Sequence, residues 1–310
     1  MRVVFMGTPD FAVPPLRALC DMGLEVVGVF CQPDKPKGRG RQLLPCPVKQ
    51  LALEKNIPVF QPVRIRQDGA DDLRALAPDL CVTAAFGQIL SEDNLAVPTI
   101  GTVNVHASLL PRYRGPAPIN WAIIHGETVT GVTTMMTDKG MDTGDILLSE
   151  RFPIGEDMTA GELTAALSER GAVLLRQTVE LLMKGTCPRV KQDPALATYD
   201  PMLRKETGLM DFNQPARALC CLIRGVDPWP GAYAMLDGEP VKIWKATALE
   251  AERGEPGDIL AADKKDGLII RCGDNSALNV TVLQMPGGKR MNAKDYLLGH
   301  TISAARFGGK

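Results

Sequence analysis

The chain has 310 residues, of which 45% are hydrophobic and 23% are charged, and its formal net charge is −1. This length allows about two domains, and the composition is that of an ordinary globular protein. The sequence has no run of about 18 apolar residues, which argues against a membrane-spanning helix, and its first apolar run is too short for a secretory signal peptide.

The first third of the chain alternates strand-like and helix-like runs. We expect strands at residues 2–6, 25–31, 57–60 and 79–85, and helices at residues 11–22, 48–55 and 68–76. This order predicts a Rossmann-like α/β domain, with a mostly parallel sheet and helices on both of its faces. The dinucleotide-binding pattern G-x-G-x-x-G is absent, since only Gly7 stands in the first turn, and we therefore expect no nicotinamide cofactor.

A basic stretch interrupts this alternation between residues 35 and 49. It contains no acidic residue, and its cations are Lys35, Lys37, Arg39, Arg41 and Lys49. Its prolines and glycines predict an extended, mobile loop. Such a loop is either a solvated surface segment or an arm that orders on phosphate groups. The net charge does not decide between them, but the clustering of cations without acids favours RNA.

The apolar run at residues 79–85 is typical of a buried parallel strand. Residues 86–90 follow its carboxyl end, where ligands bind in open α/β sheets. Gln88, Ile89 and Leu90 are therefore candidates for ligand contacts. A helix start after a turn at Gly87 is an equally good interpretation of the same residues.

The most informative stretch runs from residue 101 to residue 145. In the alternating run 103–106, Asn104 and His106 share one face of a strand, because side chains on a strand alternate with period two. A second strand at residues 131–137 leads into a turn-rich loop, 138–145, that contains Asp142. We expect these three polar side chains to meet at the ends of neighbouring strands.

An amide, an imidazole and a carboxylate suit the attack of a nucleophile on a carbonyl carbon. Asn104 can donate a hydrogen bond to the developing oxyanion, and His106 can donate a second one or carry a proton. Asp142 favours the charged imidazole. No Ser or Cys stands at a nucleophile-elbow spacing, which favours direct transfer without a covalent enzyme intermediate. The alternative is an Asn and a His that only satisfy backbone groups at a sheet edge.

The run N-V-H-A-S-L-L-P-R-Y-R-G-P-A-P-I-N-W-A-I from residue 104, followed by D-K-G-M-D-T-G-D-I-L from residue 138, resembles the formyltransferase family that uses 10-formyltetrahydrofolate. The resemblance extends from Met1 into the C-terminal part of the chain. It implies that the catalytic residues are Asn104, His106 and Asp142. It also implies a folate site, for which we expect Ser108, Leu109, Leu110, Pro111, Gln88, Ile89, Leu90, Asp138 and Gly140.

The resemblance also implies a partner for the basic stretch. In the resembled family this insertion contacts the acceptor arm of the initiator tRNA, which assigns tRNA binding to Lys35, Lys37, Arg39 and Arg41. Contacts of this kind position an RNA on the protein and do not by themselves read its sequence.

The rest of the chain predicts one more strand, a long helix and a second domain. The strand is expected at residues 146–154 and the helix at residues 159–184, where Thr159 and Glu162 form a capping-box signal. Residues 185–205 hold three prolines and little periodicity, and we interpret them as a linker. A helix at 214–226 precedes five short strands, at residues 232–236, 241–246, 257–261, 268–272 and 277–284, which predict a small OB-like β-barrel.

These elements predict a first domain at residues 1–188, a linker at 189–205 and a barrel domain at 206–310. The resemblance implies that the first domain is catalytic and that the barrel binds tRNA. Positive and negative residues balance in the barrel domain, so any RNA-binding face must be a local patch. The candidate cations for such a patch are Lys242, Lys245, Lys289, Arg290 and Lys294.

The predicted reaction moves the formyl group of 10-formyltetrahydrofolate, the co-substrate, to the α-amino group of initiator methionyl-tRNA. The alternatives are a small-amine formyltransferase, such as one acting on glycinamide ribonucleotide, a formyltetrahydrofolate hydrolase, and an RNA-binding module on an inactive scaffold. The second domain and the basic stretch argue against the first two, because a small acceptor or water needs neither.

The eight cysteines form no C-x-x-C pair and no zinc pattern with a histidine. We expect free thiols in a reducing cytoplasm, no metal, no membrane partner and a monomeric protein.

Overall fold

The computed structural model describes residues 1–37 and 42–308. The chain divides into two compact units. The first comprises Met1–Pro118, Val129–Pro153 and Thr164–Asp200, and the second comprises Ile119–Thr128, Ile154–Leu163 and Pro201–Lys310. Two short segments that precede the predicted linker thus group with the C-terminal residues, and most of the predicted linker groups with the first unit. The domain limits at residues 188 and 206 stay predictions.

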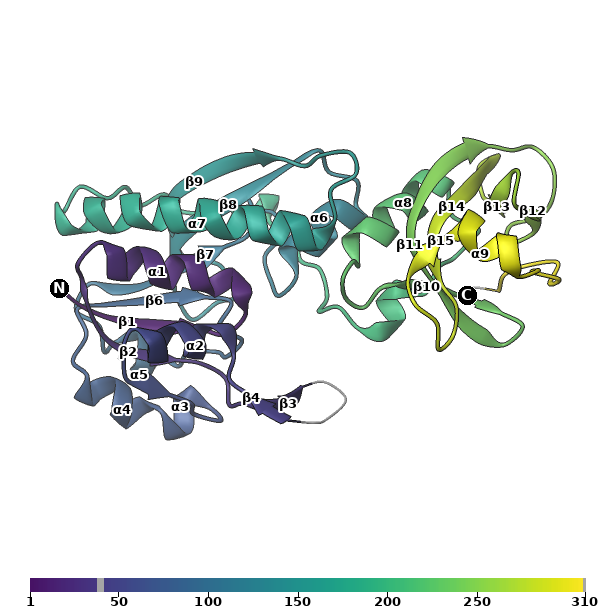
Figure 1. Cartoon of the computed structure of the whole chain (residues 1–310). Coiled ribbons are helices and arrows are strands. Elements are labelled where there is room, and N and C mark those ends of the chain that lie inside the picture. The colour runs from purple at the N-terminus through teal and green to yellow at the C-terminus, as the bar shows by residue number, and fades with distance from the viewer. Residues whose placement is uncertain (38–41, 309–310) are drawn as a thin grey trace. The chain divides into compact units, whose positions relative to one another are not determined.

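The first unit is built on a seven-stranded sheet with the strand order β5-β2-β1-β6-β7-β8-β9. Figure 1 labels the six strands from β2 to β9 in this order. Its strands are β1 (Arg2–Gly7), β2 (Glu25–Phe30), β5 (Val59–Phe60), β6 (Leu80–Ala84), β7 (Gly101–His106), β8 (Val129–Met136) and β9 (Ile146–Pro153). The pairs from β5 to β7 are parallel, whereas β7–β8 and β8–β9 are antiparallel. The predicted Rossmann-like, mostly parallel sheet is confirmed.

The helices of this part are α1 (Val13–Asp21), α2 (Pro47–Glu54), α3 (Ile65–Asp68), α4 (Ala70–Ala75), α5 (Glu92–Leu95) and α7 (Ala160–Met183). The helix predicted at 68–76 is wrong at its start, because α3 ends at Asp68 and α4 begins after Gly69. At Gly171 of α7, an added Cβ would stand 2.8 Å from Val105 Cγ1 of β7. The helix therefore covers the apolar face of β7 and leaves the Asn104 face to loops.

The long helix begins as its sequence predicts. Thr159 N donates to Glu162 Oε2 at 2.8 Å, and Glu162 N donates to Thr159 Oγ1 at 3.3 Å. These reciprocal bonds satisfy two of the amide groups that a helix start leaves without partners. The predicted capping box is confirmed.

The described flanks of the basic stretch form a two-stranded hairpin, and not the extended loop that the sequence predicts. Strand β3 (Lys35–Lys37) pairs antiparallel with β4 (Gln42–Leu44). Backbone pairing between the flanks explains the difference, because proline and glycine content alone does not reveal a partner strand. Arg39 and Arg41 lie outside the described residues.

The second unit combines helices α6 (Pro118–Ile124) and α8 (Ala216–Gly225) with an antiparallel sheet. The sheet has the order β10-β11-β14-β13-β12, with β15 paired to β14. Its elements are β10 (Ala232–Leu236), β11 (Glu239–Glu250), β12 (Ile259–Asp263), β13 (Gly267–Cys272), β14 (Ser276–Gln284), β15 (Met291–Asn292) and the following α9 (Ala293–Gly299). All five predicted strands are confirmed, whereas α6 and α9 were not predicted.

The two edge strands of this sheet are joined by residues 305–308. Met235 of β10 exchanges backbone hydrogen bonds of 2.8 and 2.7 Å with Gly308. On the other edge, Ile259 N of β12 donates to Ala305 O at 2.9 Å, and Phe307 N donates to Gly257 O at 2.8 Å. The strand ladder itself stays open, and this segment connects its two ends in the manner of a barrel.

The core of the second unit lies between α8 and the sheet. It includes Leu219 and Ile223 of α8, Ile243 of β11, Ile270 of β13 and Phe307, all nearly inaccessible to solvent.

In the described parts of the chain, 1–37 and 42–308, no helix is both long and apolar enough to cross a bilayer.

Candidate functional site

Strand β7 presents two polar side chains on one face. Val103 and Val105 are buried in the core, whereas Asn104 is half-buried on the opposite face, and His106 is 6% exposed. The alternation of the sequence is therefore reproduced in the structure, because a β-strand turns successive side chains to opposite sides.

The loop after β8 brings the carboxylate to this face. Because β8 runs antiparallel to β7, the loop begins beside Thr102, whose carbonyl oxygen accepts from Thr137 N at 2.7 Å. It then crosses β7 until Asp142 reaches Asn104 and His106. The carboxylate thus lies beside the end of β7, whose last residue is His106.

The distances within this group are short. Asn104 Nδ2 donates to Asp142 Oδ1 at 3.4 Å, and His106 Nδ1 stands 3.7 Å from Asp142 Oδ2. On the other side of the amide, Thr83 Oγ1 donates to Asn104 Oδ1 at 2.9 Å. The carboxylate of Asp142 therefore fixes which end of the amide is the donor, since a carboxylate oxygen only accepts, and the Thr83 hydroxyl donates to the other end.

The imidazole of His106 is held at one nitrogen and open at the other. Nε2 lies 2.9 Å from the carbonyl oxygen of Tyr113, which can only accept, so Nε2 carries a hydrogen. The 3.7 Å between Nδ1 and Asp142 is longer than a hydrogen bond. Nδ1 is consequently the ring atom that can exchange a proton with a substrate or with water.

The carboxylate of Asp142 and the backbone of its loop are held by groups that no sequence pattern indicates. Gly115 N donates to Asp142 Oδ2 at 2.8 Å, and the carbonyl oxygens of Asp142 and Gly144 accept from Gln192 Nε2 at 2.9 and 2.7 Å. A Cβ at Gly144 would overlap the carbonyl oxygen of Met136. Gly115 and Gln192 were not predicted from the sequence, since neither belongs to a polar pattern around residues 101–145.

The predicted folate segment 108–111 makes a compact turn. Ser108 is fully buried, and its hydroxyl donates to the carbonyl oxygen of Arg112 at 2.7 Å. Leu110 is also buried, the Leu110–Pro111 peptide is cis, and Leu109 and Pro111 are half-buried. The hydroxyl of Ser108 stabilises the turn by its hydrogen bond to Arg112. Leu109 and Pro111 are therefore the members of this segment that are more accessible to a ligand.

The second predicted folate segment follows β6. Gln88 Oε1 accepts from Ile65 N at 2.7 Å and its Nε2 donates to Pro62 O at 2.9 Å, so this side chain holds the neighbouring turn. Leu90 packs in the core, but Ile89 is 71% exposed. Of these three side chains, Ile89 is the one that offers apolar surface to a ligand.

The remaining predicted folate residues shape the carboxylate loop itself. Asp138 Oδ1 accepts from Gly140 N at 3.0 Å and from Thr143 Oγ1 at 2.6 Å. A Cβ at Gly140 would overlap Thr143 Oγ1. Both residues therefore close the turn that carries Asp142.

The base of the basic hairpin is fixed by a polar cluster. Lys49 Nζ lies 2.5 Å from Asp34 Oδ2 and 2.7 Å from Gln61 Oε1. The hydrogen bonds from Lys49 and Gln61 hold the pKa of Asp34 below its ordinary value. Lys49 is thus engaged with Asp34, whereas Lys35 is exposed on β3.

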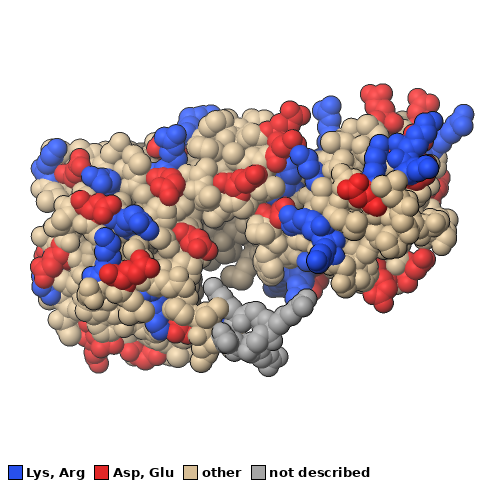
Figure 2. All heavy atoms as spheres, in the orientation of Figure 1, with Lys and Arg blue, Asp and Glu red and all other residues tan. Residues whose placement is uncertain are grey.

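The second unit carries an aromatic ring between two cations. The Arg290 guanidinium stands 3.6 Å from the centroid of the Trp244 ring, and Lys242 Nζ stands 5.2 Å from it. Two of the predicted cations thus meet at one tryptophan. Arg290 is also paired with Asp227 at 3.2 Å, and Lys245 is paired with Asp157 at 3.5 Å. On the face that Figure 2 shows, Lys and Arg are interspersed with Asp and Glu.

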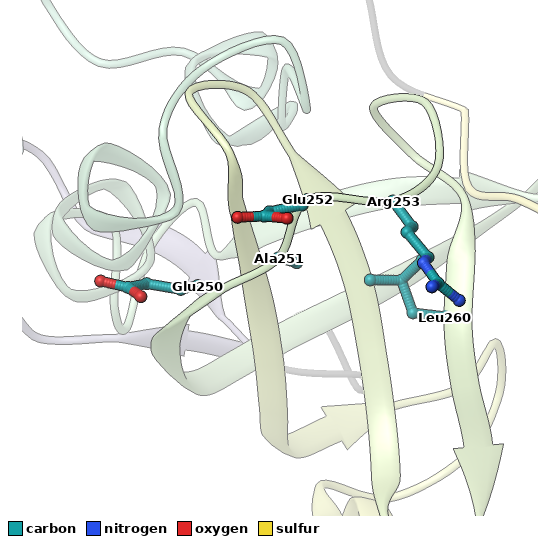
Figure 3. A pocket seen from close by; sticks show the side chains of 5 residues that line it. All are labelled: Glu250, Ala251, Glu252, Arg253 and Leu260. Atoms are coloured by element: carbon teal, nitrogen blue, oxygen red, sulfur yellow. The ribbon is translucent and has the colours of Figure 1, made fainter.

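A shallow pocket of about 510 Å³ lies elsewhere in the second unit, at the end of β11 (Figure 3). Its lining includes Glu250, Glu252 and Arg253, and none of the predicted site residues.

Among the described residues, no group of three or more His, Cys, Asp or Glu side chains is arranged to hold a metal ion.

The chain is similar to known proteins over its whole length. Residues 1–179 match the formyl transferase family and residues 202–301 match the formyl transferase C-terminal domain. The methionyl-tRNA formyltransferase of Geobacter sulfurreducens is 49% identical over 97% of this chain and 95% of its own length. That of Ruminiclostridium cellulolyticum is 45% identical over 100% of both chains.

Solved structures share the fold at lower identity. An N-formyltransferase from Helicobacter canadensis, in complex with folinic acid and dTDP-3-aminofucose, has a TM-score of 0.68 at 19% identity, over 90% of this chain and 98% of its own. HypX from Aquifex aeolicus, in complex with tetrahydrofolic acid, has a TM-score of 0.60 at 19% identity, over 96% of this chain and 47% of its own. With two family matches that together cover most of its residues, the chain belongs to the formyl transferase family.

Proposed function

We propose that this chain transfers the formyl group of 10-formyltetrahydrofolate to the α-amino group of methionine carried by initiator tRNA. The reaction belongs to translation initiation, for which the cytoplasm is the expected compartment. Identities of 45–49% to methionyl-tRNA formyltransferases over nearly the whole chain support this acceptor. The observation that carries the chemistry is the approach of Asn104, His106 and Asp142 over one face of β7.

The nucleophile of the proposed reaction is the neutral amine. A free α-amino group has a pKa of about 7.7–8.0, so part of it is unprotonated near neutral pH. When it attacks the formyl carbon, negative charge develops on the formyl oxygen, and Asn104 Nδ2 is the donor that can stabilise this charge. The carboxylate of Asp142 keeps that donor on its own side of the amide, and the Thr83 hydroxyl donates to the amide oxygen on the other side.

The proton must then leave the amine and reach the nitrogen of the leaving group. His106 Nδ1 is placed for this transfer, because Nε2 is held by the Tyr113 carbonyl. Asp142 stabilises the positive charge on the ring while the proton is on Nδ1, because its Oδ2 stands 3.7 Å from that nitrogen. The exposed side chains of Ile89 and Met141 support a folate site nearby, since both offer apolar surface on loops of the same unit.

Two surfaces support a tRNA acceptor. Lys35 and Lys37 lie on β3, and Arg39 and Arg41 follow them in the sequence. A run of cations without acidic residues suits phosphate groups. In the second unit, Trp244 with Arg290 and Lys242 combines an aromatic face with positive charge, which suits nucleic-acid bases and backbone. We assign residues 206–310 to tRNA binding on this basis.

One assay separates the proposed function from its rivals. The protein is incubated with formyl-labelled 10-formyltetrahydrofolate and with initiator methionyl-tRNA, glycinamide ribonucleotide or buffer, and Asp142→Ala is the inactive control. We expect label on the methionyl-tRNA alone. Label on the small amine, or formate released in buffer, would support the other folate enzymes, and tRNA binding without any transfer of label would support an inactive RNA-binding module.

A further inference from the structure

Gln192 lies in the segment after α7, where its side chain reaches the carboxylate loop. Val190 pairs with Ile146 through backbone hydrogen bonds of 2.8 and 2.9 Å, which aligns this segment with the end of the loop. Gln192 Nε2 then donates to the carbonyl oxygens of Asp142 at 2.9 Å and of Gly144 at 2.7 Å. One side chain thus holds the loop backbone on both sides of Thr143.

The oxygen of the same amide is equally engaged. Gln192 Oε1 accepts from Arg114 Nε at 3.1 Å and from Arg114 Nη2 at 2.8 Å. A primary amide has two N–H donors and an oxygen with two lone pairs, so these four bonds use its full capacity. The amide has one possible orientation, because turning it over would place its N–H groups against the guanidinium donors.

Arg114 ties this amide to the carboxylate itself. The side chain of Arg114 is 5% exposed, and its Nη1 donates to Tyr199 Oη at 2.7 Å. The next residue, Gly115, donates its backbone N–H to Asp142 Oδ2 at 2.8 Å. The backbone of Asp142, through Gln192, and its carboxylate are therefore both anchored to residues 114–115.

The backbone at Asp142 needs such anchoring. Its φ of 53° lies in the left-handed region, which non-glycine residues seldom occupy unless their surroundings hold them there. Without the two bonds from Gln192, the loop can relax toward a more favourable backbone conformation. Such a change would move the carboxylate away from His106 Nδ1 and Asn104 Nδ2.

We propose that Gln192 is a positioning residue, which sets the carboxylate of Asp142 against His106 by holding the backbone on either side of Thr143. The inference rests on the catalytic role proposed for Asp142. Gln192 does not touch the reacting atoms in this proposal, and its effect on the rate passes through Asp142.

The test compares Gln192→Ala and Gln192→Glu with the unchanged protein in formyl transfer to methionyl-tRNA. Glu keeps the size and the bonds with Arg114 but lacks the two donors. We expect kcat to fall about ten- to a hundredfold in both variants, with the KM for the folate and for the tRNA within about twofold of the original. A Gln192→Glu protein with unchanged kcat would overturn the proposal, because the donors would then have no role.

A double-mutant cycle separates positioning from general loosening of the fold. In an Asp142→Ala background, Gln192→Ala should have little further effect on kcat, because residues that act through one another are not additive. Ser168→Ala is the matched control, since it removes a buried 2.7 Å hydrogen bond, from Ser168 Oγ to Phe11 O, away from the carboxylate loop. It should lower the melting temperature without changing kcat.

Two further outcomes are distinguishable. Equal losses from Gln192→Ala in both backgrounds, with Asp142→Ala itself strongly impaired, would overturn the inference about Gln192 and leave the proposed function intact. A nearly normal rate for Asp142→Ala would overturn the catalytic role of Asp142, and the inference about Gln192 would fail with it.

Discussion

At the scale of single residues, the candidate site is defined by which atoms are already occupied. The carbonyl oxygen of Tyr113 accepts from Nε2 of His106, and the hydroxyl of Thr83 donates to the amide oxygen of Asn104. The remaining atoms, His106 Nδ1 and Asn104 Nδ2, both face Asp142. The direction of each donor is therefore set before any substrate binds, which is the condition for effective oxyanion stabilisation.

The first prediction concerns the three polar residues. Asn104→Ala, His106→Ala and Asp142→Ala should each lower the single-turnover rate of formyl transfer, by roughly 10²–10³ where one oxyanion donor is removed. Rapid-quench measurement at saturating folate and tRNA reports the chemical step, and circular dichroism checks the fold. Near-normal rates in all three folded variants would show that the catalytic assignment is wrong.

The second prediction concerns the residue that orients the amide. Thr83→Val removes the hydroxyl that donates to Asn104 Oδ1 and should lower kcat by roughly tenfold, because the amide then keeps only its bond to Asp142 and is less firmly placed. Thr83→Ser keeps the hydroxyl and is the matched control. Equal rates for the Val and Ser variants would remove Thr83 from the mechanism.

At the scale of elements, the basic hairpin stands on a defined base. The side chains of Asp34, Lys49 and Gln61 connect the end of β2, the start of α2 and the end of β5. Backbone pairing of β3 with β4 then carries Lys35 and Lys37 away from this base. The hydrogen bonds of Asp34 therefore hold the base of the hairpin that carries Lys35 and Lys37 against the sheet.

The third prediction is a pH dependence of stability. Asp34 has a depressed pKa in the folded protein, so its contribution is present above its unfolded pKa of about 3.9 and is lost as the pH falls through the lower folded value. Asp34→Asn should therefore lower the free energy of unfolding at pH 7 by up to about 1 kcal/mol, because solvent partly screens the pair with Lys49. In urea titrations, the difference between the two proteins should shrink as the pH falls below about 3.9 and disappear below the lower folded pKa of Asp34. A difference that stays constant over this range would contradict this cause.

The fourth prediction concerns the hairpin cations. Replacing Lys35, Lys37, Arg39 and Arg41 with alanine should weaken tRNA binding and reduce its salt dependence, by about one in the log–log slope for each phosphate group that the variant no longer neutralises. Filter binding over a range of salt concentrations measures both effects. Lys184→Ala, an exposed lysine near the end of α7, is the control, and an unchanged slope would exclude the hairpin from the RNA interface.

At the scale of the whole molecule, the second unit depends on its last described residues. Residues 305–308 bond to β10 on one side and to the start of β12 on the other, and Phe307 packs in the core beside Phe212. This segment supplies backbone partners to edge strands that would otherwise expose theirs.

The fifth prediction tests this connection. Phe307→Ala should lower the stability of the second unit by about 3–5 kcal/mol, because removing a large buried side chain leaves a cavity. All three tryptophans, at positions 121, 229 and 244, belong to the second unit, so their fluorescence reports its unfolding selectively. Thr301→Ala, at an exposed neighbouring position, should leave the fluorescence transition in place. If the fluorescence transition of Phe307→Ala has the same midpoint as that of Thr301→Ala, residues 305–308 do not stabilise the second unit.

Much of the fold could be predicted from local patterns. The period-two run 103–106 identified β7 and the shared face of Asn104 and His106, and Thr159 with Glu162 marked the start of α7. The paired flanks of the hairpin and the short helix α9 were missed, since both depend on partners outside their own segments.

The sequence by itself determined the strands and long helices, the polar residues of the site and the likeness to a family, because these depend on spacing along the chain. Only the tertiary structure decided how Asp142 crosses β7, that Gln192 holds its loop from 50 positions away, and that residues 305–308 join two strand edges. Each of these rests on hydrogen bonds between backbone groups or distant side chains, and such bonds leave no periodic mark in a sequence.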